Sequence, residues 1–92
     1  MTENIELSLI SNAIIRGNKH LYCFADALSL VEICHQNNIK VLGIDSFLIT
    51  ETKTQPFLEH SVDFSGIKDT YEVAKEFLEK KKDFGFMFEI VY

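Results

Sequence analysis

Residues 69–92, DTYEVAKEFLEKKKDFGFMFEIVY, contain the two clearest structural signals of the chain. Within 70–81 the apolar residues recur at helical spacing and cover an arc of about 160°, while the remaining positions are charged. Asp69, followed three residues later by Glu72, is an Asp-led form of the capping box that marks a helix start. Over 84–92 large apolar side chains alternate at a period of two, which is typical of a half-buried strand. The helical pattern of 70–81 and the strand pattern of 84–92 together predict a helix packed on a sheet.

The middle of the chain predicts a second helix and a central strand. Residues 24–37 form an apolar arc of about 220°. This helix is therefore expected either to pack on two sides or to expose an apolar edge to a partner. Residues 39–50 carry apolar side chains on both faces of an extended chain, as a central strand does. Gly43 within it marks a bulge or a close backbone approach.

The remaining segments complete a single domain over residues 1–92. Residues 3–16 show helical apolar spacing, with Thr2 or Asn4 as the start cap and Gly17 as the end cap. Residues 51–56 are a polar turn, and 57–64 can return as a short strand. The expected fold class is α+β, with two or three helices packed on a small, mostly antiparallel sheet. Ninety-two residues leave no room for a second core.

Charge argues against nucleic acids and membranes as partners. The net charge is −5, whereas a nucleic-acid binder needs an excess of Lys and Arg, and an anionic membrane surface also attracts basic segments. Residues 45–72 hold six acidic side chains against two lysines, which is −4 of that total. Such a surface would steer a basic protein toward it, although ordinary solubility charge is the competing explanation.

The two cysteines and the N-terminus suggest a reduced, cytoplasmic protein. Cys23 and Cys34 are too few to form a disulfide framework. The N-terminal residues MTENIELSLI carry acids and no basic region, so we do not expect a signal peptide. No apolar run approaches the ~20 residues that a membrane-spanning helix needs.

Patterns for catalysis, metals or cofactors are weak. His20-x-x-Cys23 and Cys34-His35 offer zinc-binding side chains, but their spacing is poor, and packed cysteines are the simpler interpretation. His60, Ser61 and Asp63 are close in sequence, yet neighbours on a strand point to opposite faces. Phosphate-binding glycine motifs are absent. We therefore expect a non-enzymatic protein without a cofactor or metal.

Several blocks resemble the small immunity proteins of bacterial polymorphic-toxin systems, including contact-dependent inhibition. An aromatic pair leads into a helix at 22–28, and a strand with a glycine–acid element follows at 41–47. A Tyr-led helix then occupies 71–78, and an aromatic-rich strand closes the chain at 86–92. The likeness covers residues 20–92. It departs from the family pattern at Ile44, where a second glycine is common, and in lacking a Trp near residues 60–62.

The resemblance implies that the protein binds a cognate, basic toxin and occludes its active cleft. Acidic side chains would then replace substrate phosphates, and a few aromatic anchors would add affinity. The candidate toxin-binding residues are Asp45, Phe47, Glu51, Phe57, Glu59 and Asp63.

Two alternatives remain open at this level. One is a homo-oligomeric small-molecule-binding or regulatory domain that associates through the apolar arc of 24–34 or the edge of the last strand. The other is a metal-dependent or redox protein that uses the histidines and cysteines. The residues leave the oligomeric state and the identity of any partner undetermined.

Overall fold

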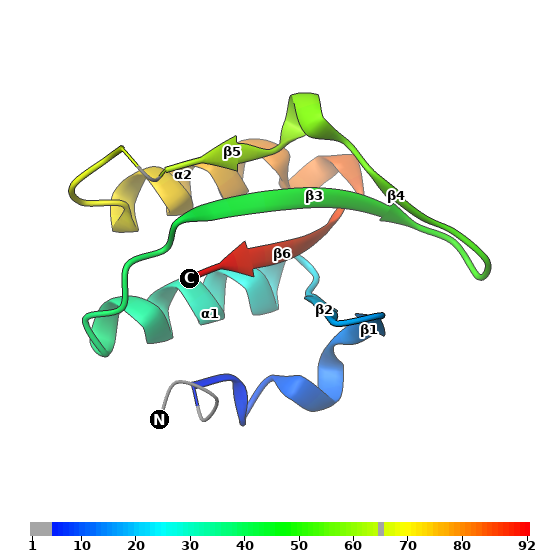
Figure 1. Cartoon of the computed structure of the whole chain (residues 1–92), viewed down its shortest axis with the longest axis horizontal. Helices are drawn as coiled ribbons and strands as arrows, with labels where there is room; N and C mark the ends of the chain where they lie inside the picture. The colour runs from blue at the N-terminus through cyan, green and yellow to red at the C-terminus, as the bar shows by residue number, and fades with distance from the viewer. Residues whose placement is uncertain (1–4, 65) are drawn as a thin grey trace.

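The chain folds as an α+β domain, which confirms the expected class. The computed structural model describes residues 5–64 and 66–92, and all statements below concern these residues. Two α-helices pack on one face of an antiparallel sheet, and a small two-stranded hairpin precedes them (Figure 1). The strands and helices, in chain order, are β1 (Ile14–Arg16), β2 (Lys19–Leu21), α1 (Phe24–Gln36), β3 (Gly43–Ile49), β4 (Thr54–Pro56), β5 (Val62–Asp63), α2 (Tyr71–Lys81) and β6 (Met87–Val91). The 3₁₀ turn η2 (Ile10–Asn12) precedes β1, while η3 (Leu58–His60) lies between β4 and β5 and η4 (Lys82–Phe84) between α2 and β6.

Strand β3 is the centre of the sheet, as its two apolar faces predict. It pairs with β6 along one side and with β4 and β5 along the other, always antiparallel. The outer edge of β6 is extended by one residue, because Tyr22 and Phe88 exchange backbone hydrogen bonds of 2.8 and 2.7 Å. Strand β3 begins at Gly43 instead of residue 39. A Cβ on Gly43 would lie 2.8 Å from the Val62 carbonyl oxygen, so the expected close backbone approach is confirmed.

The core lies between the sheet and the two helices. Ile44 of β3 and Phe88 and Ile90 of β6 face the helices, where they are buried with Leu30 of α1 and Leu78 of α2. In Figure 1 the strands lie in front and both helices behind. The face of the sheet opposite the helices therefore has no helix over it.

Helix α1 packs on two sides, which decides between the two expectations for its wide apolar arc. It contacts α2 and β6, and its four fully buried residues belong to the main core. Leu28 and Ile33, at the margins of the arc, are half-buried against the same core. Leu9 of the N-terminal segment is 8% exposed and is part of this core too. The helix consequently leaves no continuous apolar edge for a partner.

The predicted helix at 3–16 is wrong over the residues that the structure describes. Residues 5–13 form tight turns around η2, and the chain then enters β1. Two consecutive β-branched residues, Ile14 and Ile15, favour a strand, and Ile14 finds a partner in Leu21. Gly17 has φ +62° in the turn that joins β1 to β2, so it is not a helix cap. The proposed start caps Thr2 and Asn4 lie outside the described residues.

Three smaller predictions also change. The polar turn at 51–56 is shorter than expected, because residues 54–56 pair with β3. The strand at 57–64 shrinks to Val62–Asp63, since η3 interrupts it. The last strand starts at Met87, after η4 and a left-handed Gly85 with φ +78°. Helix α2 is confirmed, but its expected capping box is not formed, because the N-cap is Thr70 and has no side-chain cap hydrogen bond. Asp69 Oδ1 instead accepts a hydrogen bond from the Tyr71 amide at 3.2 Å, two residues on.

Candidate functional site

Three carboxylates occupy the helix-free face of the sheet. Side chains alternate along a strand, so the inward Ile44 and Ile90 place Asp45 and Glu89 on the opposite face. In the register of β3 and β6, Asp45 lies directly opposite Glu89. Asp63 of β5 lies opposite Gly43 and so shares this face, two residues along β3 from Asp45. Adjacent strands thus bring Asp45, Asp63 and Glu89 together as the acidic face.

The acidic face is only partly neutralised. Like charges directly opposite each other on neighbouring strands are destabilising. Lys19 Nζ lies 3.5 Å from Glu89 Oε1, and 5.9 Å from the centroid of the Phe47 ring. Both members of this ion pair are partly exposed, so the pair contributes little stability. Asp45 forms no ion pair with any side chain in the described part of the chain.

Of the other predicted residues, Glu51, Phe57 and Glu59 do not lie on this face, and Phe47 lies on it as a buried side chain. Glu51 lies at the turn between β3 and β4, and Glu59 lies in η3; both are exposed. Phe57 is half-buried on the helix side, with its ring centroid 5.4 Å from that of Phe86. Phe47 follows Asp45 by two residues on β3 and so lies on the same face of the sheet, with Lys19 Nζ 5.9 Å from its ring centroid. It is only 4% exposed, so its ring is covered and does not stand on the surface as an anchor would. The structure therefore brings Asp45, Phe47 and Asp63 to one face and places Phe57 elsewhere.

Sequence reasoning missed Glu89 and Lys19 as members of the acidic face. Both lie outside the acidic stretch 45–72. Glu89 occupies a polar position in the alternating pattern of 84–92, so the pattern places it on the solvent side. Only the pairing of β6 with β3 shows that this side also carries Asp45.

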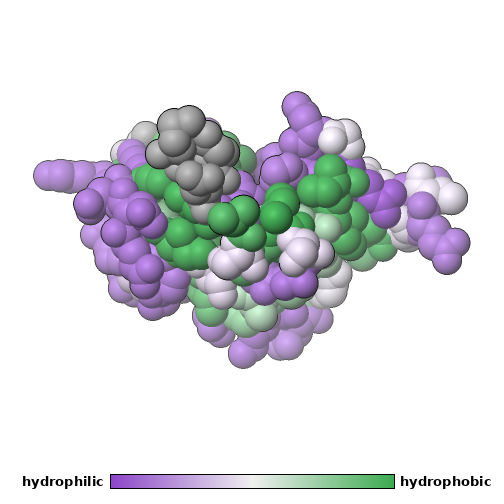
Figure 2. All heavy atoms as spheres, turned by 90° about the horizontal axis from the view of Figure 1, so that it is seen from below, coloured by the Kyte–Doolittle hydropathy of each residue, from purple (hydrophilic) through white to green (hydrophobic). Residues whose placement is uncertain are grey.

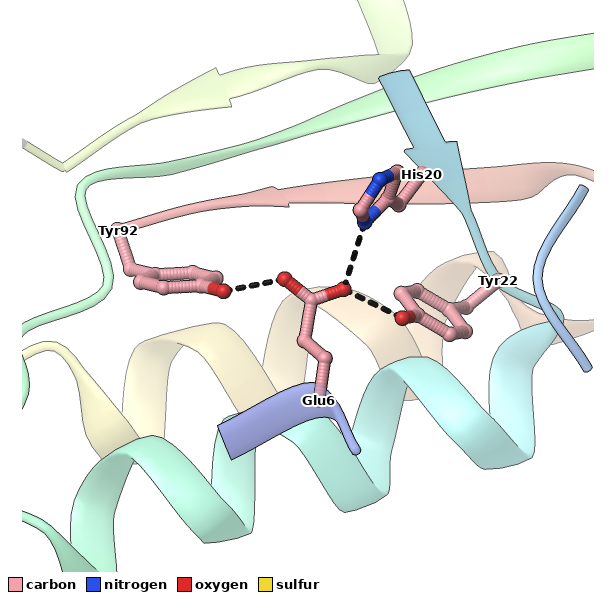
Figure 3. Close-up of polar contacts among 4 residues, drawn as sticks. All are labelled: Glu6, His20, Tyr22 and Tyr92. Atoms are coloured by element: carbon pink, nitrogen blue, oxygen red, sulfur yellow. Dashed lines mark hydrogen bonds and ion pairs between the residues drawn. The ribbon is translucent and has the colours of Figure 1, made fainter. Parts of the chain in front are cut away.

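A second polar cluster fastens the N-terminal segment to the core. Tyr22 donates its hydroxyl hydrogen to Glu6 Oε1, Tyr92 donates to Oε2, and His20 Nδ1 lies 3.1 Å from Oε1 (Figure 3). Burial raises the pKa of Glu6, but the three hydrogen bonds outweigh it, and the pKa is lowered below its ordinary value. Burial and the hydrogen bond to Glu6 raise the pKa of both tyrosines.

These pKa shifts describe a structural clamp better than an acid–base site. A carboxylate with a lowered pKa is a weak base, and tyrosines with raised pKa values are weak acids near neutral pH. The cluster adjoins a cavity of about 290 Å³ that Glu6, Tyr22, Tyr92 and Glu89 help to line. The cavity thus lies at the edge of β6, next to the acidic face.

The residue pairs considered for catalysis or metal binding do not assemble. Ser61 Oγ donates to the Phe57 carbonyl at 2.9 Å and accepts the Ser46 amide at 3.1 Å, so its hydroxyl serves the backbone. Burial raises the pKa of the Cys34 thiol to about 11, which makes a thiolate rare near neutral pH. Within residues 5–64 and 66–92, no three His, Cys, Asp or Glu side chains are grouped closely enough to hold a metal ion.

A larger hollow of about 400 Å³ lies between the end of α1 and the start of α2. The rings of His35 and Tyr71 are stacked at its rim, with centroids 3.8 Å apart. Lys40 and Lys68 also line it, over an apolar floor that includes Val31. This is the place where the small-molecule alternative would put a ligand.

Comparison with known proteins provides no relative. No family model, curated protein or solved structure matches the chain. No helix among the described residues is both long enough and apolar enough to cross a membrane.

Proposed function

We propose that the protein is a non-catalytic binding protein, an immunity protein that neutralises a cognate toxin by direct binding and occlusion. The acidic face is the proposed contact surface. The observation that supports this most strongly is the cross-strand pair of Asp45 and Glu89, in which Glu89 pairs with Lys19 and Asp45 has no ion pair among residues 5–64 and 66–92. A sheet built for stability alone would place a neutral or opposite-charge pair there.

A basic partner supplies what this face lacks. Lysine and arginine side chains of the toxin relieve the repulsion between Asp45 and Glu89, and the attraction steers the two proteins together. Exposed Glu51 and Glu59 lie outside the acidic face, so in this proposal they act on approach more than in the final contact. Electrostatic attraction of this kind weakens as salt is added, because ions screen it over about 8 Å at physiological ionic strength.

The test first asks whether the reading frame directly upstream encodes a large toxin with a variable C-terminal domain. That domain is then purified and immobilised for binding kinetics at several salt concentrations. The double variant Asp45→Asn/Glu89→Gln should slow association and flatten its dependence on salt. The matched control Glu72→Gln/Glu76→Gln removes the same charge from the exposed side of α2 and should change association little. Equal effects of the two double variants, or no binding by the wild-type protein, would count against the proposal.

A second candidate function is supported by the 400 Å³ hollow beside His35 and Tyr71, namely a small-molecule-binding, homo-oligomeric domain. Because α1 leaves no apolar edge, its interface would have to lie elsewhere. Figure 2 shows hydrophobic surface on the face seen from below. Leu7 in the N-terminal segment is 72% exposed and Ile15 of β1 is 50% exposed. Light scattering that finds a monomer at tens of micromolar would remove this candidate.

A further inference from the structure

An aromatic cluster at the end of α2 reaches solvent on the helix side of the sheet. The ring centroid of His60 lies 5.0 Å from that of Phe84 and 5.1 Å from that of Phe86, and the two phenylalanine rings are 5.5 Å apart. Two apolar side chains in this region are exposed to solvent. Phe84 is 51% exposed, and Leu58, in the same turn as His60, is 83% exposed. Apolar side chains of η3 and η4 are therefore exposed to water on either side of His60, whose ring contacts that of Phe84.

Lys81 places a cation in this cluster. Its Nζ lies 2.9 Å from His60 Nδ1 and 5.2 Å from the centroid of the Phe84 ring. The neighbouring lysines are already paired, Lys80 with Glu76 at 3.5 Å and Lys82 with Glu79 at 3.4 Å. Among the described residues Lys81 has no carboxylate partner, although Glu59 and Asp83 are close in sequence.

The contact with Lys81 also determines what His60 offers to a ligand. A lysine ammonium group only donates hydrogen bonds, so Nδ1 of His60 must accept one. A neutral imidazole that accepts at Nδ1 carries its hydrogen at Nε2. In this arrangement Lys81 Nζ and His60 Nε2 are both hydrogen-bond donors, and both residues contact the ring of the exposed Phe84.

We propose that this surface docks an acidic, apolar segment of a partner protein. Apolar side chains of the segment cover Leu58 and Phe84, and a neighbouring Asp or Glu carboxylate binds Lys81 Nζ and His60 Nε2–H. Charge complementarity selects such a segment, because the cation in the cluster lacks a counter-ion and is held in place by aromatic rings. This docking surface lies on the opposite side of the sheet from the acidic face and has the opposite charge preference, so it goes beyond the proposed function.

Capped peptides test the proposal with the full chain. The probe is fluorescein-labelled Gly-Asp-Phe-Leu-Glu-Phe-Gly with an amidated C-terminus, and its partner peptide carries Asn and Gln in place of Asp and Glu. Fluorescence anisotropy should show the acidic peptide binding about tenfold more tightly, the value of one charged hydrogen bond. Amide NMR shifts should cluster at residues 58–60 and 81–86. Equal affinity for the two peptides, or shifts located elsewhere, would overturn the proposal.

Two variants separate charge from apolar contact. Lys81→Met keeps the aliphatic stem and should abolish the preference for the acidic peptide, whereas the control Lys80→Met should keep it. Leu58→Ser changes a largely exposed side chain, so it should lower the affinity for both peptides several-fold without unfolding the protein. If the two variants Lys81→Met and Lys80→Met show the same preference for the acidic peptide, the proposed carboxylate contact is refuted. A dimer that Leu58→Ser dissociates would identify a second copy as the occupant and overturn the partner assignment.

The acidic face provides an internal control. Asp45→Asn/Glu89→Gln should leave peptide binding unchanged, because those carboxylates lie on the other face of the sheet. Failure of the docking surface and failure of the proposed function therefore give different results.

Discussion

Replacing Glu6 with glutamine preserves the size of the side chain but removes its charge and one acceptor. The side chain is 15% exposed, and its two oxygens accept hydrogen bonds from Tyr22 and Tyr92 and contact His20. Hydrogen bonds to a charged group contribute about 1.5–3 kcal/mol each. An amide keeps one accepting oxygen, so one tyrosine hydroxyl loses its acceptor and the other bond loses its charge. We expect Glu6→Gln to cost about 2 kcal/mol.

A loss of this size is easily measured in a domain of this length. It should lower Tm by about 8–16 °C in circular dichroism melts. Urea unfolding should show a lower midpoint with an unchanged slope. The matched control is Glu76→Gln, whose side chain is 70% exposed with a single ion pair to Lys80, and it should cost under about 0.5 kcal/mol. Equal melting temperatures of the two variants would show that Glu6 does not clamp the N-terminal segment.

The same carboxylate predicts how stability depends on pH. The pKa of Glu6 is lowered in the folded state from an ordinary value of 4.5. Its contribution is therefore present above pH 4.5 and is lost as the pH falls through the lowered pKa. The difference in unfolding free energy between wild type and Glu6→Gln should be full at pH 7 and shrink below pH 4.5. A difference that stays constant down to pH 3 would contradict the hydrogen-bond assignment.

Two further substitutions test the sheet. Gly43→Ala puts a methyl group 2.8 Å from the Val62 carbonyl oxygen and should lower the free energy of unfolding in urea by about 1–3 kcal/mol. The control Gly66→Ala has no atom within 4 Å of its Cβ and should cost less than about 0.5 kcal/mol. Similar costs for the two variants would mean that the close approach at Gly43 is not rigid. Asp45→Thr removes the repulsion with Glu89 and should raise the free energy of unfolding by about 0.5 kcal/mol, or Tm by about 2–4 °C. A lower Tm would show that the two carboxylates do not repel each other.

Local patterns predicted the elements whose side chains face one continuous core. In helices α1 and α2 and in strands β3 and β6, the apolar residues recur over many positions at a single spacing, that of a helix or that of a strand. The N-terminal segment misled because Ile5 and Leu9 have helical spacing, yet the segment is held by contacts to α1 and by the distant Tyr92. Turn η3 could not be predicted either, since it depends on contacts between residues 57–61 and β3.

The candidate site was only partly predictable for a related reason. The acidic composition of 45–72 is visible in the sequence, and it includes Asp45 and Asp63, which the structure places on one face of the sheet. Which carboxylates share a face depends on strand register, and register is set by pairing between distant segments. Glu89 therefore could not be joined to Asp45, and the burial of Phe47 could not be foreseen from its alternating strand.

Carboxylate footprinting of the protein, free and bound to the proposed toxin partner, tests the acidic face most directly. Carbodiimide coupling to glycine ethyl ester labels each exposed carboxylate, and mass spectrometry compares free and bound protein. We predict that Asp45, Asp63 and Glu89 become protected, whereas Glu72 and Glu76 on α2 label equally in both states. Protection of the α2 carboxylates with no change at Asp45 and Glu89 would contradict the account.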